Sequence, residues 1–544
     1  MNVSKNALRI NSNDNVAVAL CSIAKNIKIT IDSDKIISRE DIPIKHKIAL
    51  IDFKKDMPIY MYGVLVGKAT QPIQKGGLLT TENVIHLTEK VIEKKGDSPW
   101  KAPDITKWKE KTFMGYHRKD GQVGTDNIWL FFPLVFCENR NIQTLKTIFE
   151  KEFDPPKKDP NQQLLSDLIN GKEQHSSQSN NDDVKTKTPL DNIKVRFITH
   201  QGGCGGTRQD AKALARLLAG YVNNPNVAGA TVLSLGCQHL EVKMFNEALG
   251  EINSGFEKPI LMFDQQNSGT TEKFIGKIIS DSYKAIKNAN SIIRQPAPLS
   301  KLTIGLECGG SDGFSGITAN PTLGRVSDLM AALGGKTILS EFPELCGVEQ
   351  EIANRCKTDA LANKFLSLMN RYEGTAKSVG SGFDMNPSPG NIKDGLITDA
   401  IKSAGAAKKS GNSTINDILD YTEYVKEDGV SLLCTPGNDV ESTTAMAGSG
   451  ANIILFTTGL GTPTGNPITP VIKVSSNTSL AEKMPDIIDF NCGSMITENH
   501  DIETLGDLLL EQIIKIASGT ELTKATELKQ HDFIPWKRGV SLFK

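Results

Sequence analysis

The hydrophobic positions near the amino terminus fall in short runs that charges and turn residues separate. These runs occupy residues 16–20, 27–31, 47–51, 59–62 and 64–66. Short strands at this spacing are typical of a compact barrel-like or clip-like β module. We therefore predict a β-rich domain at residues 7–90. A charged stretch with glycine and proline breaks follows at residues 91–112 and is predicted to be a linker.

From residue 113 on, the pattern changes to continuous apolar runs that end in glycine-rich loops. Examples are residues 128–136, 195–199, 230–235 and 302–306. Each run is followed by a segment with helical texture, and this alternation indicates parallel sheets covered by helices. The predicted fold class is therefore α/β, with two regions of mostly parallel sheet after the β module. Their predicted bounds are residues 113–298 and residues 299–544.

A polar segment interrupts the first α/β region at about residues 155–192. It is rich in Ser, Asn, Gln and Asp and poor in aromatic residues. Such a composition buries too little apolar surface to form a core. We therefore expect a surface excursion or a disordered insert.

Charge and composition narrow the function classes. The chain has 62 Lys and Arg against 63 Asp and Glu, a formal net charge of −1. This balance predicts no electrostatic binding to nucleic acid or to an anionic membrane. No apolar run reaches the length of a bilayer span, and the first residues are polar. We expect a cytoplasmic protein with a small-molecule substrate, and homo-oligomerisation stays open.

Four of the nine cysteines lie just past the carboxyl end of a predicted strand. They are Cys137, Cys204, Cys237 and Cys308. Ligands of open α/β sheets bind at that edge, and thiolates suit iron–sulfur clusters, zinc or iron. There is no compact CxxC spacing, however, and a cysteine after a strand is often a small buried apolar residue. The group is a candidate metal or catalytic site.

Two histidines are further candidates. His200 ends a predicted strand four residues before Cys204, where it can bind a metal, carry protons or simply close the strand with a hydrogen bond. In the β module, His46 and Lys47 form a pair that suits a base beside a carboxylate anchor. A solvated turn is the alternative interpretation of that pair.

A nucleotide-binding interpretation is weak. The glycines of residues 459–465 suggest a dinucleotide fingerprint, but Pro463 and Pro467 do not open a helix. The loop at residues 202–206 lacks the Gly-Lys-Ser/Thr of a P-loop. A dinucleotide-dependent oxidoreductase remains a competing hypothesis that a failure to bind NAD or NADP would remove.

Longer motifs appear in a fixed order along the chain. They are DNVAVA at 14–19, HKIAL at 46–50, GYHR at 115–118, GTDN at 124–127, LGC at 235–237, ECGGSDG at 307–313, SGITANP at 315–321, NPSPGN at 386–391 and TPGND at 435–439. By these motifs the chain resembles the altronate and galactarate dehydratase family over nearly its whole length. The first motifs resemble its amino-terminal SAF module, a β-clip fold.

The resemblance implies a hydro-lyase that removes water from a sugar acid by β-elimination in hexuronate catabolism. Glu307 before Cys308, and the segment 436–439, resemble the altronate branch, whose substrate D-altronate yields 2-dehydro-3-deoxy-D-gluconate. Dehydration of galactarate or another sugar acid is the nearest alternative, and a non-catalytic sugar-acid binding protein is an alternative of another class. The family depends on Fe2+, which implies an iron cofactor, either mononuclear or in a cluster.

The resemblance and the residues together suggest specific roles. Cys204, Cys237 and Cys308 are predicted metal ligands, with Cys137 as a fourth and Glu344 and Glu349 as additional carboxylates. His200 is a predicted ligand or proton carrier, His46 a general acid or base, and Lys47 or Arg118 the partner of the substrate carboxylate. The predicted polyol pocket consists of Ser311, Asp312, Asn320, Arg325, Asn438 and Asp439.

Two residues depart from the family pattern. Asp126 and Leu460 stand where the family usually has cations. We expect both positions to lie near the site and to affect which sugar acid is accepted.

Overall fold

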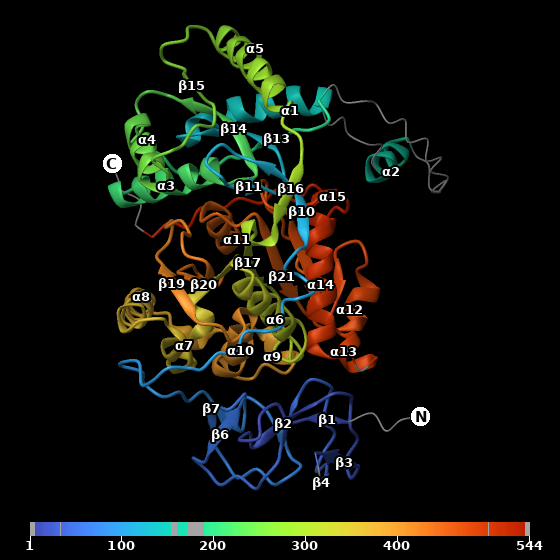
Figure 1. Cartoon of the computed structure of the whole chain (residues 1–544). Helices are drawn as coiled ribbons and strands as arrows, with labels where there is room; N and C mark the ends of the chain where they lie inside the picture. Colours follow the sequence, from blue (N-terminus) through green and yellow to red (C-terminus); the bar gives the residue numbers. More distant parts are fainter. Residues whose placement is uncertain (1–5, 33, 154–159, 171–189, 499, 539–544) are drawn as a thin grey trace.

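The computed structural model describes residues 6–32, 34–153, 160–170, 190–498 and 500–538. Three parts follow one another along the chain, and the carboxyl-terminal α/β region lies between the β module and the first α/β region (Figure 1). Most of the predicted polar insert lies outside the described residues, apart from α2, Pro160–Ile169. Within the described part of the chain, no helix has the length and apolar character needed to cross a membrane.

The amino-terminal part is a β module, as predicted. One antiparallel sheet has the order β1 (Ala7–Leu8), β2 (Val16–Ala19), β5 (Lys47–Ala49) and β8 (Leu78–Leu79). Beside it, β3 (Lys28–Ile31) pairs with β4 (Asp34–Ile37), and β6 (Pro58–Met61) and β9 (Val84–Ile85) flank β7 (Val64–Ala69). Alternate side chains of β3 and β6 are buried, the pattern of strands with one face on a core.

The first α/β region contains a four-stranded parallel sheet. Its order is β13 (Lys194–Phe197), β12 (Ile128–Pro133), β14 (Val227–Ser234) and β15 (Ile260–Asp264). Leu130 and Phe132 of β12 pack with α3 (Arg208–Asn223) and α4 (Val242–Ile252). Trp129 and Phe131 pack on the opposite face with α1 (Asn139–Phe153) and α5 (Thr271–Ala289). Burial on both faces explains why the strands are continuous apolar runs.

A small antiparallel sheet joins the two ends of this region. β10 (Thr112–His117) pairs with β11 (Val123–Gly124) and with β16 (Gln295–Pro298). The chain therefore enters and leaves the first α/β region side by side.

The carboxyl-terminal region contains a seven-stranded sheet that is parallel throughout. Its order is β19 (Ile415–Leu419), β20 (Gly429–Leu433), β18 (Lys336–Leu339), β17 (Thr303–Cys308), β21 (Ile453–Thr458), β22 (Val471–Ser475) and β23 (Phe490–Asn491). After β17 the chain steps to one side and later returns to the other side of the same strand. Ligands bind at the carboxyl edge beside such a reversal. The predicted α/β class with mostly parallel sheets is confirmed.

Helices cover both faces of this sheet (Figure 1). The α-helices are α6 (Ala319–Ala332), α7 (Glu349–Arg355), α8 (Asp359–Ser378), α9 (Pro389–Lys393), α10 (Asp399–Ala407), α11 (Asp439–Gly448), α12 (Thr478–Lys483), α13 (Ser494–Thr497), α14 (Ile502–Ala517) and α15 (Lys524–Glu527). Short 3-10 helices are η1 (Phe136–Glu138), η2 (Leu299–Lys301), η3 (Phe342–Leu345), η4 (Phe383–Met385) and η5 (Lys408–Ser410).

The β module contacts the carboxyl-terminal region through residues 45–47, which we call the docking loop. Lys45 Nζ lies 2.9 Å from a carboxylate oxygen of Asp312. Lys47 is fully buried, and its Nζ donates to the carbonyl oxygen of Gly395 at 2.5 Å and to that of Lys45 at 3.2 Å. The Lys47 ammonium therefore joins two parts of the chain and does not face a substrate-accessible space.

We expect Lys47→Met to flatten the pH dependence of stability. Burial lowers the pKa of Lys47 from 10.5 to about 7, with Asp312 opposing the shift. Between these values the unfolded chain binds more protons than the folded one, so stability rises with pH. From pH 7 to pH 9 this residue contributes a rise of about 2 kcal/mol, at about 1.4 kcal/mol per pH unit.

The measurement is the midpoint of urea unfolding at a series of pH values. Lys68→Met is the control, because Lys68 forms a partly exposed pair with Asp56. Equal slopes for the wild type and Lys47→Met would contradict the assignment.

Candidate functional site

A buried cluster of a thiol and carboxylates lies at the carboxyl end of β17. The Sγ of Cys308 lies 2.9 Å from Glu344 Oε2 and 3.5 Å from Glu341 Oε2. The candidate ligand atoms of these three residues all lie within 4.8 Å of one another, and all three residues are buried. The cluster therefore brings together residues from the carboxyl ends of β17 and β18, beside the point where the strand order reverses.

Two lysines balance part of the negative charge. Lys402 Nζ lies 2.5 Å from Glu344 Oε1, and Lys409 Nζ lies 3.6 Å from Glu341 Oε2. Both lysine side chains are at most 10% exposed. They come from α10 and η5, so tertiary packing alone brings them to the end of β17.

A second group of carboxylates shares Glu341. Glu307, Glu341 and Asp439 also have candidate ligand atoms within 4.8 Å of one another. Glu307 Oε2 accepts hydrogen bonds from Ser340 at 2.8 Å and Ser442 at 2.6 Å, whereas Oε1 is buried without a hydrogen-bond partner among the described residues. Carboxylates this close to each other repel, and a bound cation would relieve that repulsion.

Burial and charge act differently on the neighbouring carboxyl groups. Burial, with the Glu344 carboxylate, raises the pKa of Glu341. Burial also opposes ionisation of Glu344, but Lys402 and Lys409 outweigh it and lower the pKa of Glu344. Burial raises the pKa of the Cys308 thiol well above its usual range. Without a bound cation, the cluster thus holds one ionised carboxylate beside two groups that retain their protons.

The backbone of Glu341 is in an unusual conformation. Its φ is 65°, in the left-handed region that non-glycine residues rarely adopt. The N–H of Glu341 donates to Thr435 Oγ1 at 2.8 Å, which helps to hold this conformation. Strained residues are concentrated at functional sites, and here the strain fixes the carboxylate beside Cys308.

Loops after β17, β20 and β21 form the rim of the cluster. A Cβ on Gly309 would overlap the Asp439 carboxylate, so only glycine allows this close approach. Leu460 lies over Gly310 and is 44% exposed. No helix follows β21 directly, as a dinucleotide-binding turn would require, because the next element is β22.

The predicted polyol residues divide into two groups. Asp439 lies at the cluster, Asn438 caps α11 and is exposed beside it, and Ser311 is buried in the β17 loop, where its carbonyl oxygen accepts from Asn391. The other three are engaged with other parts of the protein. Asp312 accepts hydrogen bonds from Ser476 and Asn477. Asn320 forms hydrogen bonds with Gly405 and Thr457, and Arg325 packs on Gly506 of α14.

Arg118 is placed where it cannot reach a substrate at this cluster. Its guanidinium donates to the Pro225 carbonyl oxygen at 2.8 Å and to Asn127 Oδ1 at 2.9 Å. Asp126 lies nearby at the amino end of β12 and pairs with Lys194 at 2.7 Å. This is the edge of the sheet opposite the cysteine loops, so the expectation that Asp126 lies near the site is wrong.

The structure divides the predicted cysteine ligands between two sheets. Cys137, Cys204 and Cys237 follow the neighbouring strands β12, β13 and β14, as predicted, and all three are exposed. Cys308 belongs to the other sheet and is buried. Among the described residues, no group of candidate ligands within 4.8 Å of one another contains Cys137, Cys204 or Cys237. A single site built from all four cysteines is therefore not formed.

His200 is a hydrogen-bonded residue at the end of a strand. Its Nε2 lies 2.7 Å from the Pro133 carbonyl oxygen, and its Nδ1 accepts the N–H of Gly202 at 3.1 Å. Burial lowers its pKa to about 4, so the ring is neutral near pH 7. With both ring nitrogens engaged, His200 is not free to bind a metal or carry protons.

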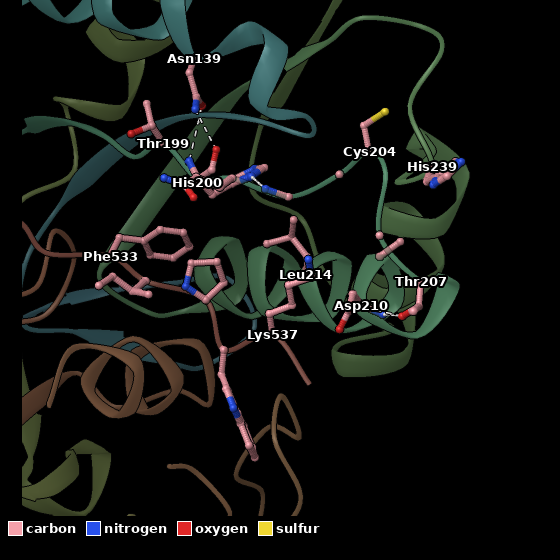
Figure 2. A pocket seen from close by; sticks show the side chains of 18 of the residues that line it. Asn139, Thr199, His200, Cys204, Thr207, Asp210, Leu214, His239, Phe533 and Lys537 are labelled. Carbon is pink, nitrogen blue, oxygen red and sulfur yellow. Dashed lines mark hydrogen bonds between the residues drawn. The ribbon is translucent and has the colours of Figure 1, made fainter. Parts of the chain in front are cut away.

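A cavity of about 730 Å3 adjoins this histidine. It is bordered by the loop of residues 199–207, the start of α3 and the segment 533–537. Figure 2 shows Asn139 bonded to His200, and the Cys204 thiol directed away from Leu214 and Lys537. Neither the cluster at Cys308 nor the carboxylate group at Glu307 borders this cavity.

His46 lies on the docking loop of the β module. It is half-buried, and its Nδ1 lies 3.1 Å from the Ile44 carbonyl oxygen. A Cβ on Gly395 would lie 3.4 Å from its backbone nitrogen, so the loop is in close contact with the carboxyl-terminal region. Its role in proton transfer stays a prediction.

One residue of the cluster, Glu341, and the two lysines beside it were not predicted. Glu341 follows the apolar run of β18, so the strand-end rule that selected Cys308 also applies to it. Lys402 and Lys409 have no local signal in the sequence.

Comparisons with known proteins agree along the whole chain. The SAF domain of altronate/galactarate dehydratases matches residues 5–87, the second domain of D-galactarate dehydratase/altronate hydrolase matches residues 115–290, and the D-galactarate/altronate dehydratase C-terminal domain matches residues 299–541. Altronate dehydratase of Bacillus subtilis is 33% identical over 540 residues, covering 99% of this chain and 100% of that protein. Altronate dehydratase of Escherichia coli is 32% identical, covering 99% and 98%. Galactarate dehydratase (L-threo-forming) of Escherichia coli is 28% identical, covering 91% and 89%.

Proposed function

Because the chain belongs to the altronate/galactarate dehydratase family, we propose that it removes water from D-altronate to give 2-dehydro-3-deoxy-D-gluconate. The observation that carries the proposal is the full-length similarity to two altronate dehydratases, each above 30% identity. The buried cluster at Cys308 supplies a site for this hydro-lyase chemistry. The same similarity to enzymes of sugar-acid catabolism supports a cytoplasmic location.

We propose Fe2+ as the cofactor, held by Cys308, Glu341 and Glu344. One thiol and two carboxylates within 4.8 Å of one another form a mixed donor set that suits a borderline divalent ion. The buried Oε1 of Glu307 has no hydrogen-bond partner among the described residues, so an acceptor beside the cluster remains to be matched. When bound, Fe2+ would stabilise the enediolate that forms on loss of the C2 proton and polarise the leaving C3 hydroxyl.

The chain's own residues position and enclose this chemistry. Lys402 fixes Glu344, and Lys409 stabilises Glu341 across the cluster. Asp439 and the loop of Leu460 border the rim, where a polyol would be oriented. The docking loop of the β module carries His46 to the carboxyl-terminal region, and we assign this residue to proton transfer with the substrate.

The test of the function is an anaerobic assay of the iron-loaded protein with D-altronate and, separately, with galactarate. We expect a 2-keto-3-deoxy acid from D-altronate, loss of product with a chelator, and recovery on adding Fe2+. Turnover of galactarate alone would assign the protein to the other branch. Absence of product from either acid, in protein shown to contain iron, would contradict the proposed hydro-lyase activity.

We expect Leu460→Arg to strengthen binding of the sugar acid. Leu460 is 44% exposed over Gly310, so a guanidinium there would reach an anionic substrate at the rim. A partly exposed charge pair contributes up to about 1 kcal/mol, which corresponds to about a fivefold decrease in KM. Leu508→Arg, on the exposed face of α14, is the matched control and should leave KM unchanged. An unchanged KM in Leu460→Arg would place the substrate elsewhere.

A further inference from the structure

A second cluster of metal-ligand type lies where the β module meets the carboxyl-terminal region. His86 follows β9 of the module, Cys346 follows η3, and Asp399 is the first residue of α10. Candidate ligand atoms of all three lie within 4.8 Å of one another. His86 Nδ1 is in direct contact with Asp399 Oδ1. Three segments far apart in the sequence thus converge on one point.

Asp399 indicates that this point is built for a ligand. Its side chain is 2% exposed. Both of its carboxylate oxygens are buried, and the carboxylate faces the His86 imidazole and the Cys346 thiol. Buried carboxylate oxygens normally have strong hydrogen-bond donors, because an unmatched buried charge is costly. A thiol is a weak donor, so this carboxylate is poorly matched for its burial.

The electrostatic surroundings favour a cation. The charged groups that act most strongly on Cys346 are Glu349, Asp399 and Glu373, all of them carboxylates. Glu349 is itself acted on by Glu373 and Asp399. A nucleophilic cysteine needs positive surroundings that favour the thiolate, so these carboxylates argue against a Cys-His-Asp catalytic triad. A divalent metal ion would neutralise the same groups.

We propose that His86, Cys346 and Asp399 bind a zinc ion that fastens the β module to the carboxyl-terminal region. Zinc takes nitrogen, sulfur and oxygen ligands, and three protein ligands leave a fourth position for water. The site is distinct from the Cys308 cluster but adjoins it in sequence. Cys346 lies two residues after Glu344, and Asp399 lies one helical turn before Lys402. A metal ion here would therefore also hold the segments that carry Glu344 and Lys402.

The test uses the full-length protein, stripped with a chelator and titrated with Zn2+ and, as a spectroscopic probe, Co2+. We expect the wild type to bind zinc at this site and to show thiolate-to-cobalt charge-transfer absorption. Because the Cys308 thiolate can also bind cobalt, the comparison is made in a Cys308→Ser background, where Cys346→Ser should abolish the remaining absorption and His86→Ala should lower zinc affinity on the order of 100-fold. Cys308→Ser alone and Cys21→Ser are the matched controls and should keep zinc at His86, Cys346 and Asp399.

The outcomes separate the proposal from its rivals. Equal zinc affinity and equal cobalt absorption in Cys308→Ser with and without His86→Ala or Cys346→Ser would overturn it. Loss of the signal in Cys308→Ser with retention in Cys346→Ser would move the ion to the first cluster and also overturn it. Rapid alkylation of Cys346 that zinc does not slow would favour a nucleophilic cysteine instead. Circular dichroism of each variant, compared with the stripped wild type, shows whether a loss reflects metal binding or unfolding.

Discussion

Cys308→Ser is expected to lower the rate of D-altronate dehydration by about 100-fold to 1,000-fold and to remove most of the bound iron. Lewis-acid stabilisation of the developing charge contributes several kcal/mol, and each 1.36 kcal/mol corresponds to a tenfold change in rate. The side chain is buried between two carboxylates, and serine keeps its shape while replacing the soft sulfur donor by a harder hydroxyl oxygen. Turnover and iron content are measured on the same anaerobic preparation.

The matched control is Cys204→Ser, at an exposed cysteine in the first α/β region. It should retain iron and activity, because no cluster of candidate ligands in the described chain contains Cys204. Full activity in Cys308→Ser together with loss of iron in Cys204→Ser would place the metal site in the first α/β region instead of the carboxyl-terminal region.

Lys409→Met is expected to destabilise the folded protein by about 3–5 kcal/mol, the cost of removing a buried cation that stabilises the ionised Glu344 carboxylate. Lys409 is 1% exposed, lies 3.6 Å from Glu341, and acts electrostatically on Glu307, Glu341 and Glu344. The midpoint of urea unfolding measures the effect. Lys408→Met is the matched control, because its pair with Glu351 is partly exposed and contributes less than about 1 kcal/mol.

Measured on the metal-free protein, the loss in Lys409→Met should also grow as the pH rises above about 8, where Glu341 begins to ionise in the wild type but not in the variant. Burial already raises the pKa of Glu341 and of Glu307, and removing the lysine raises both further. A carboxyl group with a raised folded pKa favours the folded state at low pH and loses that contribution as it is forced to ionise. A loss that is constant across this range would contradict the electrostatic role of Lys409.

The fold class could be predicted from local hydrophobic patterns because each pattern reflects which faces of an element are buried. The strands of both α/β regions are covered on both faces, so they appear as apolar runs such as residues 230–235, which overlap β14 and extend one residue past it. The β module alternates burial along β3, and its short runs were visible for the same reason. The order of strands in the sheets has no such local signature, because it depends on where each helix returns the chain.

The site was only partly predictable for the same physical reason. Cys308 was found from its place after an apolar run, and Glu344 was named as an additional carboxylate. Cys137, Cys204 and Cys237 satisfied the same rule, yet they lie at the edge of a different sheet. Lys402 and Lys409 reach the cluster only through packing of α10 and η5, which no spacing in the sequence reveals.

The most direct test of the central claim is iron-edge anomalous diffraction from crystals grown anaerobically with Fe2+. The account predicts an anomalous peak within bonding distance of Cys308 Sγ and of the carboxylates of Glu341 and Glu344. A peak among Cys137, Cys204 and Cys237, with none at Cys308, would contradict the assignment and return the catalytic metal to the first α/β region.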